Sequence, residues 1–376
     1  MRIGIEAQRI FRSHKHGMDI VALELIRALQ INDTTNEYFI FVKKGPDTAC
    51  LQETANFKIV EVPGVTYADW EQIFLPIYAT KYKLDVLHST SNTAPILYRG
   101  NKVLTLHDVI FFEKNVKAAT TFSWYQQLGR VYRKFIVPAS IRNTNTLITV
   151  SEFERGRISE LLQMNTQQIE VIYNAIGAHF GVKPTTAAIQ LVKLTYKLPE
   201  NYIFYIGNTD PKKNIFKTIR AYRNYCISAV DPLPLVIADV APAFLDKVLE
   251  TTDCKSLRKR IVLTDYINNK DLPAIYAGAS LFLYPSLRES FGIPVIEAMA
   301  CGTPVITSNT SALPEVTGNA AELVDPNNEK SIGKAILKVL EQPEIAQNLV
   351  KNGFERIKYF SWNTSALKLQ NIYQTI

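Results

Sequence analysis

This chain of 376 residues contains little cysteine and no long hydrophobic run. Its four cysteines form no C-x-x-C pair, so the sequence predicts a reduced compartment and no disulfide framework. No stretch approaches the ~20 apolar residues that a membrane-spanning helix needs. Residues 1–6 lack the apolar segment of a signal peptide and predict a first buried strand instead. These absences favour a cytoplasmic protein, in which any membrane contact is peripheral.

The formal net charge is +7, and two basic clusters carry part of it, at residues 130–134 and 255–260. Nucleic acid has the right charge to be a partner, but the chain lacks a recognition-helix or base-stacking motif, so we expect no nucleic acid. An anionic substrate or an anionic membrane surface would explain the same sign. A basic cluster taken alone is usually a solvated helix face.

Short apolar segments alternate with helical periods along the chain, which predicts parallel sheets covered by helices on both faces. The expected fold class is α/β, with two doubly wound, Rossmann-like domains facing a central cleft. The polar, broken segment 178–186 separates a domain at 1–178 from one at 179–376. A helical stripe covers Val21–Leu29, and the tail 362–376 predicts a terminal helix. Strands are expected at Ile3–Ala7, Glu37–Val42, Val86–His88, Val103–Leu106, Thr146–Val150, Ile169–Ile172, Tyr202–Ile206, Leu235–Ala238, Ile261–Leu263, Leu281–Tyr284 and Val305–Ser308.

The most informative segment is residues 289–297, which read E-S-F-G-I-P-V-I-E. Pro294 favours the first turn of a helix, so Glu289 would precede this helix and Glu297 would lie near its N-terminus. Free N–H groups and the positive end of the helix dipole attract an anion such as a diphosphate. Sugar hydroxyls are natural partners for the two carboxylates, which would otherwise repel that anion. The segment therefore predicts a nucleotide-sugar site, although an isolated pair of this kind is more often a pair of surface or capping carboxylates.

With its continuation A-M-A-C-G-T-P-V, this segment resembles the E-x7-E signature of the retaining glycosyltransferases of family four. The resemblance also covers Met1–Glu6, Thr105–Val109, Ile148–Phe153, Tyr205–Asn214 and Phe360–Trp362. It implies the GT-B architecture, with an acceptor-side first domain, a donor-binding second domain and a terminal helix that packs back on the first. It also implies transfer of a hexose, mannose or glucose, from a GDP- or UDP-linked donor. The acceptor would be a glycan or lipid-linked glycan, in surface polysaccharide synthesis.

The resemblance implies catalytic roles for His107, Glu289 and Lys213. His107 follows an apolar strand, where polar side chains face the crevice, and in the family this histidine lies beside the transferred sugar. Lys213 matches the family lysine that contacts the donor diphosphate, for which a flexible ammonium is suited. Glu289, expected as an exposed loop carboxylate, would hold sugar hydroxyls, and Glu297 would hold the ribose. His107 could instead be a structural histidine with satisfied hydrogen bonds.

Further donor contacts are implied for a glycine loop and for backbone groups. Gly17 is the glycine that remains of the family's G-G-I-G loop, before a helix expected from about Ile20, and it could equally be a turn residue. Asn208 stands where some relatives carry arginine, and Lys212 could replace that cation or face solvent. The other implied contacts are at Tyr266 and Ile267 beside the nucleobase, and at Ser290, Phe291, Gly292 and Ile293 beside the diphosphate.

We expect no metal and no cofactor. The chain has no D-x-D, so a metal-clamped diphosphate is not expected, and lysine and helix dipoles would neutralise the leaving group. His14 and His16 lack further metal-ligand spacing and are interpreted as exposed loop residues. No carboxylate is placed as a nucleophile for a double displacement. The resemblance therefore implies same-face attack, in which a donor phosphate oxygen takes the acceptor proton.

An apolar stripe with basic neighbours is typical of core packing, although it could also face an acceptor or a membrane. Two other function classes fit the same fold. A nucleotide-sugar epimerase would rearrange its substrate without an acceptor. A non-catalytic subunit of a polysaccharide assembly complex would keep the fold and lose turnover, which the intact set of site residues argues against. The stripe consists of Trp124, Tyr125, Leu128, Val131, Tyr132 and Phe135.

Overall fold

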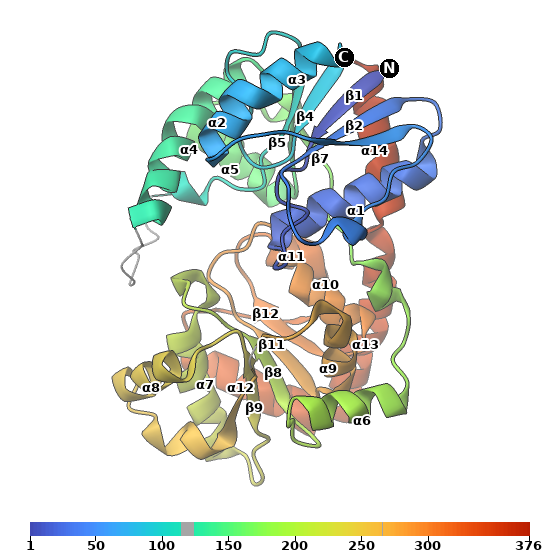
Figure 1. The fold of residues 1–376 in the computed structure, drawn as a ribbon. Coiled ribbons are helices and arrows are strands. Elements are labelled where there is room, and N and C mark those ends of the chain that lie inside the picture. Colours follow the sequence, from blue (N-terminus) through green and yellow to red (C-terminus); the bar gives the residue numbers. More distant parts are fainter. Residues whose placement is uncertain (114–123, 265) are drawn as a thin grey trace. The chain divides into compact units, whose positions relative to one another are not determined.

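The computed structural model describes residues 1–113, 124–264 and 266–376. They form two compact units, each built on its own sheet (Figure 1). The first unit contains the described residues up to Asn174 together with Ser361–Ile376, and the second contains Ala175–Phe360. The chain thus passes into the second unit after Asn174, where the sequence placed the boundary after residue 178, and its C-terminal segment belongs to the first unit.

The sheet of the first unit has seven parallel strands, and its order reverses in the middle, between β1 and β4. In an open parallel sheet, such a reversal leaves a crevice outside the carboxyl ends of the two central strands, where ligands bind. The strands in spatial order are β3 (Phe57–Glu61), β2 (Glu37–Val42), β1 (Arg2–Glu6), β4 (Val86–Ser89), β5 (Asn101–Thr105), β6 (Thr146–Thr149) and β7 (Ile169–Val171).

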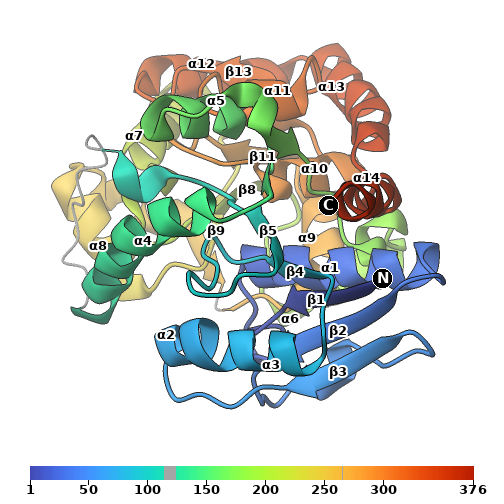
Figure 2. The ribbon, with the colours of Figure 1, turned by 90° about the horizontal axis from the view of Figure 1, so that it is seen from above.

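Both faces of this sheet are covered because successive side chains of each strand point to opposite sides. On one face, Ile5 and Ile40 pack with helices α1 (Gly17–Asn32) and α14 (Trp362–Gln374). On the other face, Phe39 and Phe41 pack with Trp70 and with α3 (Leu75–Lys81). Figure 2 shows α1 and α3 on the two sides of the strands.

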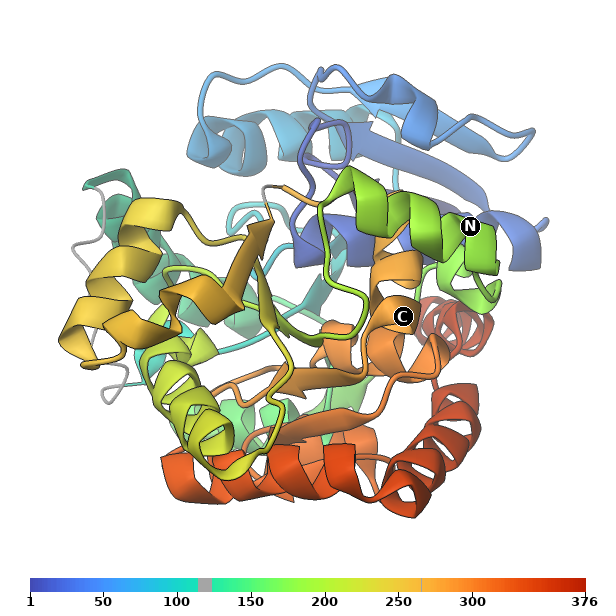
Figure 3. The ribbon, with the colours of Figure 1, turned by 90° about the horizontal axis from the view of Figure 1, so that it is seen from below.

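The sheet of the second unit repeats this plan with six parallel strands, and its order reverses between β8 and β11. Helices α7, α8 and α12 cover one face, and α6, α9 and α10 cover the other. Figure 3 shows α7, in yellow-green, beside the orange-red α12. The strands in spatial order are β10 (Ile261–Thr264), β9 (Leu235–Ala238), β8 (Ile203–Ile206), β11 (Leu281–Tyr284), β12 (Val305–Ser308) and β13 (Glu322–Val324).

Two parallel, doubly wound sheets of this order are the α/β fold that the sequence predicts. Within the described residues, no helix is long and apolar enough to span a membrane. All four cysteines are free thiols, as expected. The remaining helices are α2 (Tyr67–Asp69), a π-helical turn (Trp70–Phe74), α4 (Trp124–Arg142), α5 (Glu152–Leu162), α6 (Thr186–Thr195), α7 (Ile215–Ser228), α8 (Pro242–Thr251), α9 (Leu272–Gly278), α10 (Ile293–Ala300), α11 (Leu313–Thr317), α12 (Glu329–Glu341) and α13 (Pro343–Arg356).

The expected core packing of the apolar stripe on α4 is wrong where the structure describes it. Phe135 is 74% exposed and Val131 is 51% exposed, while Tyr132 turns inward and donates a hydrogen bond of 2.6 Å to Glu71. The side chains of the other three stripe residues, from 124 to 128, lie outside the described residues. The apolar contacts of α4 are made instead by Val137 and Ile141, which lie beyond the stripe, while Tyr132 meets the polar network around Glu71.

Candidate functional site

The reversal of strand order in the second unit brings Lys213, Tyr284 and Glu289 together. Lys213 lies in the turn that follows β8, Tyr284 is the last residue of β11, and Glu289 lies in the loop after it. The Lys213 ammonium donates to Glu289 Oε1 at 2.8 Å and also contacts the Tyr284 hydroxyl. Tyr284 donates to the same Oε1 at 2.9 Å. Two of the three predicted catalytic residues are therefore in direct contact.

The expectation that Glu289 is an exposed loop carboxylate is wrong, because only 9% of this residue is accessible. Burial raises the pKa of the Glu289 carboxyl, but the nearby Lys213 and Lys212 charges and the two hydrogen bonds outweigh it and leave the pKa lowered. Glu289 is therefore ionised at neutral pH. Its carboxylate is a fixed acceptor, as the recognition of sugar hydroxyls requires.

Backbone contacts fix both ends of this pair. The Glu289 N–H donates to Ser311 Oγ at 3.1 Å, and its carbonyl accepts from the Arg288 guanidinium at 3.1 Å. Lys213 ends a short 3-10 turn that Asp210 caps through the Lys212 N–H, and its carbonyl accepts from the Tyr205 hydroxyl at 2.7 Å. These hydrogen bonds therefore hold the backbone of both charged residues in place.

Glu297 lies on α10 and has a different environment. Its Oε2 accepts from the Tyr276 hydroxyl at 3.2 Å. Burial raises its pKa to about 7, and the Tyr276 hydrogen bond offsets only part of this effect. Gly292 caps the start of α10 with φ +100, a backbone conformation that favours glycine, and an added Cβ would lie 2.8 Å from Leu313 Cδ2. The segment Ser290–Ile293 therefore forms the N-terminal end of the helix, as the sequence predicts.

The other predicted donor contacts of the second unit are loop residues. Asn208 Oδ1 accepts from the Asp210 N–H at 2.9 Å, which makes it a turn-forming residue. Lys212 Nζ lies 3.8 Å from Asp210 Oδ2, and its charge also acts on Glu289. Tyr266 is 61% exposed, whereas Ile267 packs against the core of the unit.

In the first unit, His107 follows β5 and is held by the loop that follows β4. Its Nε2 lies 2.9 Å from the Thr90 carbonyl, and its N–H donates to Asn92 Oδ1 at 2.6 Å. Because a carbonyl only accepts, Nε2 carries the proton and Nδ1 carries the lone pair. Burial lowers the pKa of His107, so the ring is neutral at pH 7. Asp108 accepts from the Ile110 N–H at 3.1 Å and so orients the following loop.

Gly17 begins α1, so the helix starts before the expected position near Ile20. The exposed His16 caps it, and Asp19 accepts from the His16 N–H at 3.0 Å and pairs with Arg9 Nε at 3.0 Å. An added Cβ at Gly17 would have no neighbour within 4 Å, and the backbone is not left-handed. Neither packing nor conformation therefore requires glycine here, which leaves close approach of a ligand as a reason for it.

Sequence reasoning missed several polar residues at the ends of the central strands. Tyr284 ends β11 and was predicted from the sequence only as the last residue of a strand, and Tyr276 lies on α9 and was not singled out. Glu6 ends β1 and is 1% exposed, and its Oε2 accepts from the Thr90 N–H at 3.1 Å. The rule that identified His107, a polar residue that ends an apolar strand, would have found Tyr284 and Glu6 as well.

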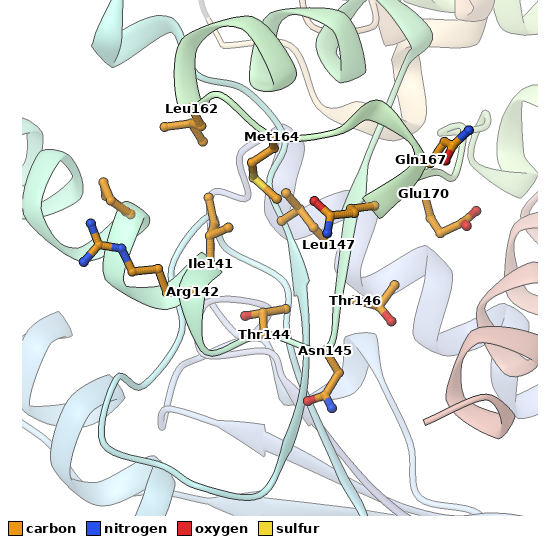
Figure 4. Close-up of a pocket in the computed structure, with 12 residues that line it drawn as sticks. Ile141, Arg142, Thr144, Asn145, Thr146, Leu147, Leu162, Met164, Gln167 and Glu170 are labelled. Carbon is orange, nitrogen blue, oxygen red and sulfur yellow. The ribbon is translucent and has the colours of Figure 1, made fainter.

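Two further observations concern metal ligands and cavities. Among the described residues, no group of three or more His, Cys, Asp or Glu side chains is placed to hold a metal ion. Figure 4 shows a pocket of about 560 Å³ where β6 begins, lined by Ile141, Leu147 and Met164 among others. None of the predicted site residues lines this pocket. The candidate site is therefore identified by the polar contacts of Lys213, Tyr284 and Glu289, and not by this pocket.

Two family models together match most of the chain. The model described as Glycosyltransferase Family 4 matches residues 16–179, and the one described as Glycosyl transferases group 1 matches residues 189–356. The second match contains Lys213, Glu289 and Glu297, and the first contains Gly17 and His107. The matched ranges thus cover every residue that the sequence assigned to the site.

Individual proteins agree with these models. O-antigen chain mannosyltransferase B of Escherichia coli is 28% identical over 275 residues, which are 73% of this chain and 70% of that protein. The serotype-specific mannosyltransferase WbdA of Escherichia coli is 29% identical over 236 residues, 62% of this chain but only 29% of WbdA. The structure of Anabaena HepE in complex with UDP and glucose has a TM-score of 0.76 at 16% identity, covering 100% of both chains. At this identity, the structural likeness shows the fold alone.

Proposed function

Because this chain belongs to the glycosyltransferases of family four, which have the GT-B fold, we propose that it transfers a hexose from a nucleoside diphosphate sugar to a glycan or lipid-linked glycan. The contact of Lys213 with Glu289 at the strand reversal of the second unit carries this proposal. It places a cation for a diphosphate beside an ionised carboxylate for sugar hydroxyls, and a nucleotide sugar contains both groups.

The chemistry of the leaving group explains the cation. As the anomeric bond breaks, negative charge accumulates on the diphosphate, and the Lys213 ammonium would stabilise it. The N-terminal end of α10 would contribute through its N–H groups and helix dipole. Glu289 would orient the sugar ring and Glu297 the ribose, and such orientation of reactants is itself a large catalytic contribution.

Mannose is the transferred sugar that the relatives favour, since two curated relatives are named as mannosyltransferases and one of these names refers to the O-antigen chain. We therefore propose GDP-mannose as the first donor to test and UDP-glucose as the second, with surface polysaccharide as the product. We propose that the anomeric configuration is retained by same-face attack. His107 would accept a hydrogen bond from the transferred sugar through its unprotonated Nδ1.

A donor screen followed by product analysis tests this proposal. Purified protein is incubated with GDP-mannose or UDP-glucose and a glycan acceptor, and NMR of the product reports the anomeric configuration. We expect an α-linked product from an α-linked donor, and no product from Glu289→Gln. Rearranged nucleotide sugar formed without an acceptor would favour an epimerase instead. A protein that binds no nucleoside diphosphate in calorimetry would contradict the proposal.

We further propose that the protein acts in the cytoplasm and contacts an anionic membrane surface through α4. The exposed Phe135 and Val131 adjoin Arg133 and Lys134 on this helix. Apolar side chains flanked by cations fit the interface of anionic lipids. A lipid-linked acceptor would be presented there.

Vesicle sedimentation tests this contact. We expect binding to vesicles that contain phosphatidylglycerol, weaker binding to phosphatidylcholine alone, and loss of binding in Phe135→Glu. Leu194→Glu is the matched control, because Leu194 is an equally exposed apolar residue of the second unit, at 77%. Equal binding by the two variants would show that α4 is not the contact.

A further inference from the structure

We propose that Glu71, which the sequence did not single out, is a positioning residue for His107 and acts through the loop from Thr90 to Thr93. The proposal rests on the proposed function, in which His107 contacts the transferred sugar. It concerns the first unit only, where both residues form hydrogen bonds to the same loop.

The loop after β4 determines how His107 lies. Thr90 accepts from its ring through the carbonyl, and Asn92 accepts from its backbone N–H through Oδ1. Asn92 has φ +70, in the left-handed region that few residues other than glycine adopt, and its own N–H donates to the Thr105 carbonyl at 3.1 Å. A loop with such a backbone needs outside contacts to hold its conformation.

Glu71 supplies a contact at the other end of this loop. The Thr93 hydroxyl donates to Glu71 Oε1, and Tyr67 donates to the same oxygen at 2.9 Å. Oε2 accepts from Tyr132 at 2.6 Å and from Gln72 at 2.7 Å. The four donors come from α2, the π-helical turn, the loop and α4, so the Glu71 carboxylate connects four segments.

Burial makes this arrangement sensitive to change. Glu71 is 1% exposed and lies in the π-helical turn Trp70–Phe74, a rare backbone form that is often found at functional sites. Burial raises its pKa, and the hydrogen bonds offset part of that rise. Each hydrogen bond offsets part of the cost of burying the carboxylate and at the same time holds the segment that supplies the donor. If one donor is lost, the segment that carried this donor is released.

Two single substitutions separate positioning from general support. Thr93→Val removes the link between Glu71 and the loop, together with the contact of Thr93 with Tyr67, whereas Tyr132→Phe removes the link between Glu71 and α4, together with the contact of Tyr132 with Gln72. The readout is the pair of ring nitrogen signals of His107 in protein labelled with ¹⁵N-histidine, assigned with His107→Gln. This readout does not depend on turnover. We expect the His107 signals to move in Thr93→Val and Glu71→Gln, to stay in Tyr132→Phe, and to be restored in Thr93→Ser.

Kinetics complete the test. If Thr93→Val displaces the His107 ring, kcat should fall roughly 10- to 100-fold, with little change in KM for the donor. Unchanged His107 signals in folded Thr93→Val and Glu71→Gln would overturn the proposal. Signals that move without any loss of kcat would support the positioning and instead contradict the proposed contact of His107 with the sugar. Circular dichroism at each variant confirms that the fold is kept.

Discussion

The Lys213 ammonium nitrogen lies 2.8 Å from Glu289 Oε1, so two residues that are expected to hold different parts of a donor are in contact with each other. The side chains are 13% and 11% exposed, and therefore the pair is shielded from solvent. A diphosphate must share the ammonium with Glu289 in order to bind. A change at this contact is therefore expected to alter both the affinity for the donor and the free energy of unfolding.

Replacing Glu289 should therefore affect both activity and stability. Glu289→Gln leaves a shielded ammonium without its counter-ion, so we expect no transfer and a loss of about 3 kcal/mol in the free energy of unfolding. Urea denaturation measures the loss. Glu322→Gln is the control, because Glu322 forms a more exposed pair with Lys338 at 2.9 Å and should change stability by less than about 1 kcal/mol. Equal effects of the two substitutions would contradict a buried, functional pair.

Removing Lys213 should weaken donor binding more than removing Lys212. A charge-assisted hydrogen bond contributes roughly 1.5–3 kcal/mol, so we expect Lys213→Ala to raise the Kd of the nucleoside diphosphate ~10- to 100-fold. Lys212 Nζ is drawn to Asp210 at 3.8 Å and should contribute less. Calorimetry with GDP and UDP gives both values. Similar losses at both positions would mean that Lys212 replaces the cation missing at Asn208.

Gly17→Ala separates a ligand contact from a turn. Because neither φ nor neighbours require glycine, alanine at the start of α1 should leave the free energy of unfolding unchanged or raise it by up to ~1 kcal/mol. A Cβ in the path of a phosphate should nevertheless lower kcat/KM by about tenfold or more. Gly156→Ala, in α5, is the matched control, since its Cβ also meets nothing within 4 Å. Full activity of Gly17→Ala would show that no ligand approaches there.

Glu297 should make stability depend on pH near neutrality. Its pKa is raised from 4.5 to about 7 in the folded protein, so its contribution to stability is present below pH 4.5 and is lost as the pH rises through 7. The loss is about 3 kcal/mol for a shift of this size. Denaturation at pH 5 and pH 8.5 should show this decline in the wild type and not in Glu297→Gln. All other titratable groups are the same in the two proteins, so their contributions cancel in the difference.

Transfer should be independent of divalent metal, as the absent D-x-D predicts. Activity is measured in EDTA and again after addition of magnesium or manganese. We expect equal rates, because Lys213 and the N-terminal end of α10 neutralise the diphosphate. Complete loss of turnover in EDTA, with recovery in either metal, would contradict this prediction.

The sequence by itself determined the fold class, because apolar strands that alternate with helical periods leave few other ways to bury both faces of a parallel sheet. All eleven strands that it predicts are present, within a residue or two at their ends. It missed β3 and β13, which lie at sheet edges and have exposed positions that interrupt the apolar pattern. The motif at residues 289–297 also located the start of α10, because Pro294 favours the first turn of a helix.

Only the tertiary structure decided what surrounds each site residue. Burial and ion pairing depend on segments far apart in the chain, such as Lys213 and Glu289, or Glu71 and Thr93, and no local pattern encodes that distance. For this reason the sequence took Glu289 for an exposed carboxylate and the outer residues of α4 for core. Residue types set the chemistry that is available, and the packing of distant segments set the pKa of Glu297, the tautomer of His107 and the partners of Glu71.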